Sequence, residues 1–218
     1  MNKIKILAAA LVLASGQLLA SGVATVSTGD GKSKVQMSIE YDAGHTRMNM
    51  PMESQQGSGY MLFRDGKVWM VANVQGQTMV MDMARMRAGH PATGGDALQQ
   101  EFISARPTGQ KARVAGFSGE VYELTWKETG QTRSDKVVLS EDPVVVEYSN
   151  AWLGMAEGMA AAMGHKMKNS ISGYLRKEGL GMLKMGDSFE VVSIKPGKVD
   201  ARRFNLPKST FQMPSMPR

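Results

Sequence analysis

The chain contains no cysteine among its 218 residues. This absence excludes disulfide bonds, thiol chemistry and zinc sites built from thiolates. It also excludes a lipid anchor attached to a cysteine at a signal-peptide cleavage site. Aromatic residues are few, at 6%, whereas methionine occurs 19 times. A flexible thioether suits irregular apolar surfaces, and it is a ligand for soft metal ions. The methionines are therefore the residues most informative about function.

Recognisable catalytic motifs are also missing. The three histidines form no H-E-x-x-H pattern, and the segment Gly116 to Gly119 lacks the G-x-S-x-G spacing of a nucleophile elbow. We interpret Ser118 in that segment as a turn residue and expect a protein that is not an enzyme. The basic residues form no stripe with interleaved aromatic residues, so we expect no nucleic acid partner.

The N-terminus has the pattern of an export signal. Lys3 and Lys5 precede an apolar run from Ile6 to Leu13, and Ala20 supplies a small residue at the expected cleavage point. The apolar run is well short of the ~20 residues needed to span a bilayer. We predict a signal peptide at residues 1–20 and a mature protein in the periplasm or outside the cell.

The mature chain carries a mild positive charge. Without the two signal-peptide lysines it has 24 basic and 20 acidic residues, a formal charge of +4. The basic residues are scattered, which is typical of a solvated surface, although this sign of charge also suits an anionic membrane surface. We expect a single β-rich domain at residues 21–206 and a flexible tail, rich in proline and methionine, at residues 207–218.

Alternation of apolar and polar residues predicts strands through most of the mature chain. Asp65-Gly66 and Gln75-Gly76 are hairpin signals within the first set, which we expect to form an antiparallel meander. This set comprises 35–41, 46–52, 60–64, 67–74 and 78–83. A second set is expected at 112–117, 120–127, 136–139 and 144–148. Prolines and glycines in residues 84–110 predict a long loop holding one short helix capped by Asp96.

The pattern becomes helical after Asn150, which is a good N-cap. An apolar stripe at spacings of three and four then predicts a helix over about 151–168. Its members are Trp152, Met155, Met159, Met163 and Met167. Glycines such as Gly154 and Gly158 each cost about 1 kcal/mol in a helix interior, and are tolerated where the helix packs closely on another element. A shorter helix is expected at 171–177 and a last strand at 189–194.

Several short motifs together resemble a known group of proteins. They are Thr46-Arg47-Met48, Asp65 to Trp69, Met79 to Asp82, Ala115-Gly116-Phe117 before Val121-Tyr122, Asp142-Pro143 as a strand entry, and the closing Phe204-x-Leu206-Pro207. In an exported chain these motifs resemble a widespread group of uncharacterised bacterial secreted proteins. That group is similar in turn to the outer-membrane lipoprotein carriers and lipoprotein-sorting proteins. The resemblance implies an α+β fold, an antiparallel open β half-barrel with helices covering the concave face, and it implies no catalytic residues. The carriers hold acyl chains in such a shape.

The methionines have three interpretations. In the first, they line an adaptable cavity for an apolar or lipidic ligand, and the expected lining residues are Met79, Met81, Met83, Trp152, Met155, Met159 and Met163. In the second, they bind Cu(I), because methionines two residues apart on a strand place both sulfurs on one side, about 6.5 Å apart. The expected copper ligands are His45, Met48, Met50, Met52, Met163, His165 and Met167. In the third, they only pack the core.

We predict a periplasmic carrier that holds an apolar or lipidic ligand in a methionine-lined concavity and uses no cofactor. The alternative is a periplasmic Cu(I)-binding protein that serves copper tolerance. The strand at 78–83 and the helix at 151–168 are expected to face each other, because each needs a partner surface and no other segment offers so large an apolar face.

Overall fold

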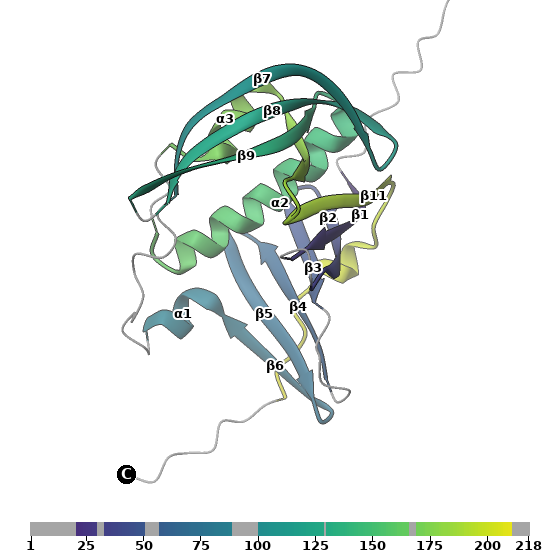
Figure 1. Ribbon diagram of the computed structural model, residues 1–218. Coiled ribbons are helices and arrows are strands. Elements are labelled where there is room, and N and C mark those ends of the chain that lie inside the picture. The colour runs from purple at the N-terminus through teal and green to yellow at the C-terminus, as the bar shows by residue number, and fades with distance from the viewer. Residues whose placement is uncertain are drawn as a thin grey trace, which may run out of the picture.

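The computed structural model describes residues 21–29, 33–50, 57–88, 100–128, 130–165 and 169–210. In these residues, eleven strands form one antiparallel sheet that does not close on itself (Figure 1). The order across the sheet is β6-β5-β4-β3-β2-β1-β11-β10-β9-β8-β7. The strands are β1 (Ser21–Thr28), β2 (Val35–Asp42), β3 (His45–Met50), β4 (Gly57–Arg64), β5 (Lys67–Val74), β6 (Gln77–Asp82), β7 (Gln100–Val114), β8 (Phe117–Glu128), β9 (Gln131–Ser140), β10 (Gly181–Met185) and β11 (Phe189–Pro196). The predicted signal peptide lies outside the described residues.

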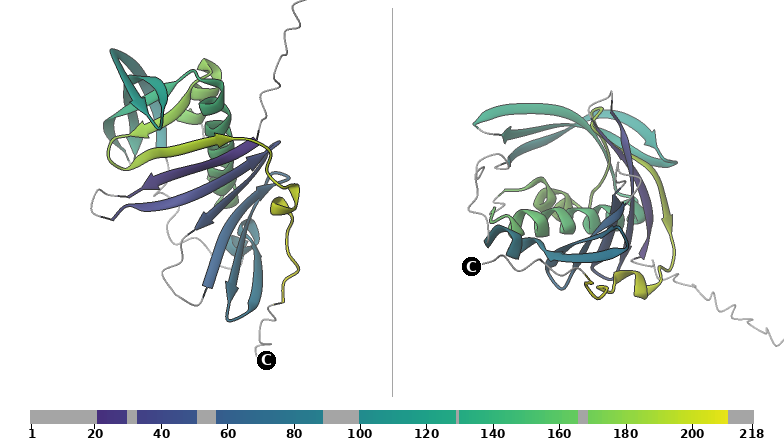
Figure 2. Two further views of the ribbon diagram at one scale, coloured as in Figure 1. Left: turned by 90° about the vertical axis from the view of Figure 1, so that its right-hand side faces the viewer. Right: turned by 90° about the horizontal axis from the view of Figure 1, so that it is seen from below.

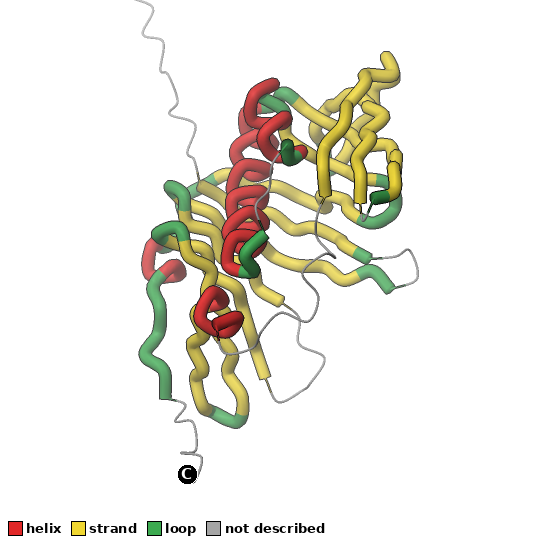
Figure 3. Tube along the Cα trace, turned by 90° about the vertical axis from the view of Figure 1, so that its left-hand side faces the viewer, coloured by secondary structure: helices red, strands yellow, loops and turns green. Residues whose placement is uncertain are grey.

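Helices pack on both faces of the sheet. Within the described residues, α1 (Met83–Ala88), α2 (Pro143–Ala162) and α3 (Ile171–Glu178) lie on one face, and the short 3-10 helix η1 (Ala201–Phe204) lies on the other. Figure 2 shows that the sheet is curved, with α2 on the inside of the curve, and Figure 3 shows α2 crossing the sheet. α2 packs against β10 and also against β3, β4 and β5. The result is an open, β-rich α+β fold.

The first group of predicted strands is confirmed as β2 to β6, in which each strand pairs antiparallel with the next. Both residues of the turns Asp65-Gly66 and Gln75-Gly76 have positive φ. Two-residue turns of this kind match the twist of the strands that they join. The end of the group needs one correction: Met83 begins α1 and does not belong to the last strand.

The prediction of a long loop over residues 84–110 is wrong at both ends. α1 extends to Ala88, and β7 begins at Gln100 and runs through Pro107 and Gly109. β7 is the edge of the sheet, and its register with β8 is irregular between Pro107 and Lys111. Edge strands with irregular register tolerate proline and glycine, which is why these residues misled the prediction. Asp96 lies outside the described residues.

Two further strand boundaries differ from the prediction. The turn between β7 and β8 is Ala115-Gly116, both with positive φ, so Ser118 lies in β8 and is not a turn residue. Its carbonyl accepts a hydrogen bond from Ser140 Oγ at 2.7 Å. β1 and β10 were not predicted.

The predicted strand at 144–148 is the first part of α2. Asp142 is the N-cap, its Oδ1 accepting from Val144 N at 2.9 Å, and Pro143 occupies the first turn. Proline is favoured there because its missing N–H would have no helical partner. The run of valines suggested a strand, but Val145 and Tyr148 are fully buried at helical spacing. The same correction applies to Asp142-Pro143, which begins a helix rather than a strand.

The main core lies between α2 and the sheet. Tyr148 of α2 is buried there with Ile39 and Leu183 from the strands. Glycines let the helix come close to the sheet. A Cβ on Gly158 would lie 2.8 Å from the Phe63 ring and 3.0 Å from Val68, whereas one on Gly154 would lie 3.8 Å from Phe63. The expectation that these glycines mark a close contact is therefore confirmed most clearly at Gly158.

A smaller core on the opposite face holds the C-terminal segment. Leu62, Val199 and Phe204 are buried together there. Beside them the Glu40 carboxylate accepts hydrogen bonds from Arg203, at 2.8 Å to its Nε, and from Asn49 at 3.1 Å. Burial alone would raise the pKa of Glu40, but these hydrogen bonds and the arginine charges lower it below its ordinary value. η1 is thereby fixed against β2 and β3.

Residues 207–210 belong to the predicted tail. The backbone N–H of Thr210 donates to Thr78 O at 2.9 Å, and Thr78 N donates to Thr210 Oγ1 at 2.8 Å. This part of the tail therefore lies along the edge strand β6. Residues 211–218 lie outside the described residues.

Gly158→Ala should destabilise the protein by about 1–3 kcal/mol relative to Gly154→Ala, because only the first places a methyl group inside contact distance of the sheet. Both substitutions bring the same gain in helix propensity, so the difference between them measures the packing. Urea unfolding of the two variants gives that difference. Equal stabilities would show that α2 does not approach Phe63 and Val68 this closely.

Candidate functional site

The strand methionines lie on the face of the sheet that α2 covers. Met48, Met61, Met70 and Met81 are paired in one row across β3 to β6. Met48 and Met61 are buried in the main core, and directly paired residues share a face of the sheet. Met81, and Met79 two residues before it, therefore face the side of α2.

The predicted cavity residues of the helices have different environments. Met155 is 2% exposed and belongs to the core, and Met159 and Met83 pack against its edge. Trp152 stacks on Phe189, with 6.1 Å between ring centroids. Met163, expected in the same apolar wall, is 41% exposed beyond the end of α2. Most of this set fills the core between helix and sheet.

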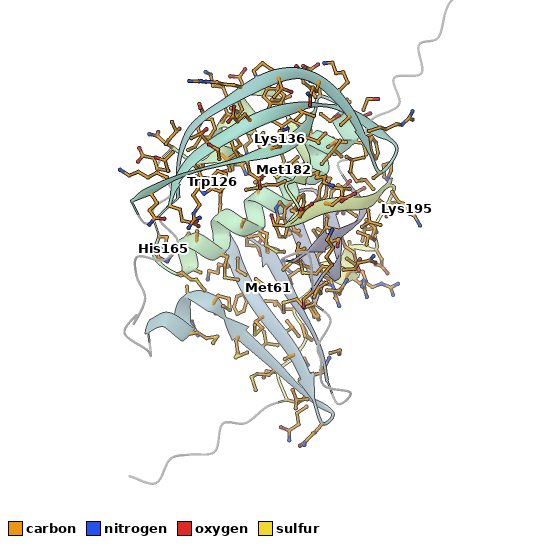
Figure 4. All side chains as sticks on the ribbon, viewed as in Figure 1. Met61, Trp126, Lys136, His165, Met182 and Lys195 are labelled. Carbon is orange, nitrogen blue, oxygen red and sulfur yellow. The ribbon has the colours of Figure 1, made fainter. Side chains whose placement is uncertain are left out.

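An enclosed apolar pocket lies elsewhere on the same face, under the arch of β7 and β8 and beside the start of α3. Its volume is about 80 Å³. β7 and β8 form one wall, β10 another, and α3 the cover. The lining residues are Phe102, Leu124, Trp126, Ser170, Ile171, Met182 and Met185. Figure 4 labels Trp126 and Met182 between the arch and α2.

The cover of the pocket is built by the N-terminus of α3. Ser170 caps the helix, and its Oγ accepts from Gly173 N at 3.3 Å. Phe102 N donates to Asn169 O at 2.7 Å, which joins β7 to the residue before the cap. The Tyr174 ring stacks on Phe102 with centroids 4.8 Å apart. These contacts hold α3 over the apolar wall.

A polar clamp joins α3 to α2. Glu157 Oε1 on α2 accepts from Ser172 Oγ at 2.5 Å and from Arg176 Nη1 at 2.7 Å, both on α3. Burial alone would raise the pKa of Glu157, but the hydrogen bonds from Arg176 and Ser172 lower it below its ordinary value. The clamp is charge-assisted, and it is the kind of contact that can open without disturbing a core.

Sequence reasoning missed this pocket because it missed two of its walls. Phe102 was assigned to a loop, and Met182 and Met185 belong to the unpredicted strand β10. Leu124 and Trp126 alternate within a strand that was predicted. Phe102 and Ile103 are both apolar, so the sequence gives no such alternation there, although Ile103 is 51% exposed while Phe102 packs against the core.

Other cavities are less suited to an apolar ligand. One of about 290 Å³ between the β2–β3 hairpin and α2 has Asp42, His45 and Glu147 in its wall. Another, of about 600 Å³ near the β7–β8 turn, is lined by Lys111, Glu120 and other charged residues. Carboxylates and ammonium groups in the wall favour polar ligands.

The proposed copper ligands are not gathered into one group. His45 stacks against Phe204 on the outer face of β3, with 5.9 Å between centroids, whereas Met48 and Met50 pack toward α2. Met163 and His165 lie at the end of α2, and Met52 and Met167 lie outside the described residues. Within the described part, no three histidine or carboxylate side chains come together as metal ligands would. Copper binding by thioethers stays a prediction.

No protein-family model, curated protein or solved structure matches the chain. Among the helices of the described residues, none combines the length and apolar character needed to cross a membrane.

Glu157→Gln should remove a stabilising contribution that exists only while Glu157 is ionised. Because the folded pKa is lowered, this contribution is fully present above the ordinary pKa of 4.5 and is lost as the pH falls through the folded value. The difference in melting temperature between parent and variant should therefore be constant near neutral pH and shrink below pH 4.5.

Glu178→Gln is the matched control for this prediction. Glu178 is on α3 and forms a looser, exposed pair with Lys177 at 3.6 Å. Its removal should leave the pH dependence of melting as in the parent. A Glu157→Gln variant that behaves like the control at every pH would show that the clamp does not hold α3.

Proposed function

We propose that the protein is an exported, non-enzymatic carrier that holds an apolar or lipidic ligand between its curved sheet and its helices. In this proposal the sheet acts as an open half-barrel, and the pocket under α3 receives the apolar part of the ligand. The observation that carries the proposal is this enclosed pocket, which is lined by aromatic, aliphatic and methionine side chains on the inner side of the sheet. Ligand pockets in proteins are typically concave, apolar and few.

The chemistry of the lining supports an adaptable site. Met182 and Met185 form the β10 side, opposite the aromatic rings of Phe102 and Trp126. Methionine has several rotatable bonds and a polarisable sulfur, so it repacks around ligands of different shape. A wall of this kind suits acyl chains of varied length better than a ligand of fixed shape.

The size of the pocket requires α3 to act as a lid. A volume of about 80 Å³ admits only the end of a chain. α3 is eight residues long and ends at Gly179 in the left-handed conformation, with φ of 65°. Leu175 is fully buried in the main core and anchors the second turn of α3, so the movement is confined to the first turn. The Glu157 clamp and the Tyr174–Phe102 stack are the contacts that this movement would exchange. We infer that a longer chain enters as these contacts open.

The expected location agrees with this activity. A signal peptide at residues 1–20 would deliver the carrier to the periplasm or outside the cell, where lipids must cross water between membranes. The formal charge of +4 on the mature chain would favour approach to an anionic membrane surface. Both points rest on the sequence.

Ile171→Asp should weaken apolar ligand binding at least tenfold, because it places a charge in the pocket lining under the lid. Ile103→Asp is the matched control, since Ile103 neighbours the pocket residue Phe102 but is 51% exposed. Native mass spectrometry of protein purified from exporting cells gives the fraction that carries lipid. Titration with the neutral dye N-phenylnaphthylamine gives the affinity.

The parent and the Ile103→Asp protein should retain ligand, and the Ile171→Asp protein should lose it while keeping a cooperative melting transition. A parent protein that carries no apolar adduct and binds no dye would contradict the carrier function. Equal binding by both aspartate variants would show that the binding site does not lie under α3.

A further inference from the structure

One residue that lines the pocket under α3 carries a buried polar atom without a partner. Trp126 lines the pocket, and its indole Nε1 is buried with no hydrogen-bond partner. Buried indole N–H groups usually find an acceptor, and an unsatisfied one destabilises the protein. Such an atom in the wall of a binding pocket requires an explanation.

The rest of the lining does not supply that acceptor. Ser170 Oγ already accepts from Gly173 N and shares a hydrogen bond of 2.7 Å with Ser172 Oγ. The remaining lining side chains are aromatic, aliphatic or thioether groups, of which the thioether is only a weak acceptor. The pocket therefore combines an apolar surface with a single donor.

We infer that the ligand is an acyl ester, whose carbonyl oxygen accepts a hydrogen bond from Trp126 Nε1 while its chain lies against the apolar wall. This inference rests on the proposed carrier function. An indole N–H only donates, so the ligand must supply an acceptor. An ester accepts hydrogen bonds and donates none, so it leaves no new polar group unpaired in the pocket.

Charge distinguishes the ester from a free fatty acid. Arg133 is paired with Trp126 across β8 and β9, but its Nε binds Glu128 at 3.1 Å and its side chain is 54% exposed. Among the residues that the structure describes, no cation lines the pocket. Burying a carboxylate without a partner is far more costly than burying a neutral carbonyl.

Opening of the lid would both admit the acyl chain and give its ester access to Trp126 Nε1. Nε1 is buried, and Ile171 and the cap residue Ser170 line the same pocket. In this inference these two residues move aside to let a carbonyl reach Nε1. A chain that opens the lid then exposes the donor to which its ester end binds.

The test compares three probes on the full mature protein at pH 8: octane, ionised octanoate and methyl octanoate, the last with an eight-carbon acyl chain. The ester should bind about five- to tenfold more tightly than octane, the effect of one hydrogen bond, and more tightly than octanoate. In ¹⁵N-labelled protein, the indole N–H signal of Trp126 should move downfield with the ester and not with octane. This signal is read on the parent protein and needs no variant to fold.

Trp126→Phe should lower the ester affinity to that of octane. Trp69→Phe, the same substitution at an indole packed against the smaller core on the opposite face of the sheet, should keep the preference for the ester. Equal binding of ester and octane by the parent, an unmoved Trp126 signal, or tightest binding of octanoate would overturn the ester assignment while leaving a carrier of apolar ligands. Binding of none of the three probes would reject the carrier function as well.

Discussion

The close packing of α2 on the sheet is the constraint on which the rest of the structure depends. A Cβ on Gly181 would lie 2.5 Å from the Val145 carbonyl oxygen, so the backbone of β10 nearly touches the first turn of α2. Farther along, Gly158 gives the helix the same freedom beside Phe63 and Val68. One helix thus packs against two distant parts of a single sheet. The open sheet has to curve for both of these parts to contact the helix.

Polar contacts support this packing without interrupting the core. Thr46 Oγ1 donates to Ala151 O at 3.2 Å, and Met182 N donates to Ser149 Oγ at 3.2 Å. The first joins β3 to α2, and the second joins β10 to α2. The second satisfies a backbone N–H of β10, at the position where the register of β10 with β9 shifts. The register of the pocket wall at Met182 is set by the same helix whose Glu157 holds the lid.

The sequence predicts the parts of this arrangement that have regular periods. Strands β2 to β6 and α3 follow alternation, helical spacing and turn chemistry, and the structure contains them. Features that depend on tertiary context were missed. The valines after Pro143 have strand propensity, but the cap at Asp142 and the burial of Val145 and Tyr148 make them helical. β10 has five residues beginning with glycine, and one of its two partners, β9, is distant in the sequence. The sequence also did not indicate the pocket under α3, since a methionine stripe has the same pattern in a core as in a pocket wall.

The free energies of the contacts that hold α3 are similar in size to the free energy gained by burying a short apolar chain. An exposed ion pair contributes up to about 1 kcal/mol and an aromatic pair about 0.5–1.5 kcal/mol. Burying four methylene groups contributes about 3 kcal/mol before the losses of chain entropy, which is comparable to the sum of those contacts. The Glu157 clamp and the Tyr174–Phe102 stack therefore keep the empty pocket covered, yet a chain of moderate length can displace them. The movement is confined to the start of α3 and the side chains around it, because Leu175 in the second turn is fully buried in the main core. Losing one such side chain would cost as much as the whole chain gains.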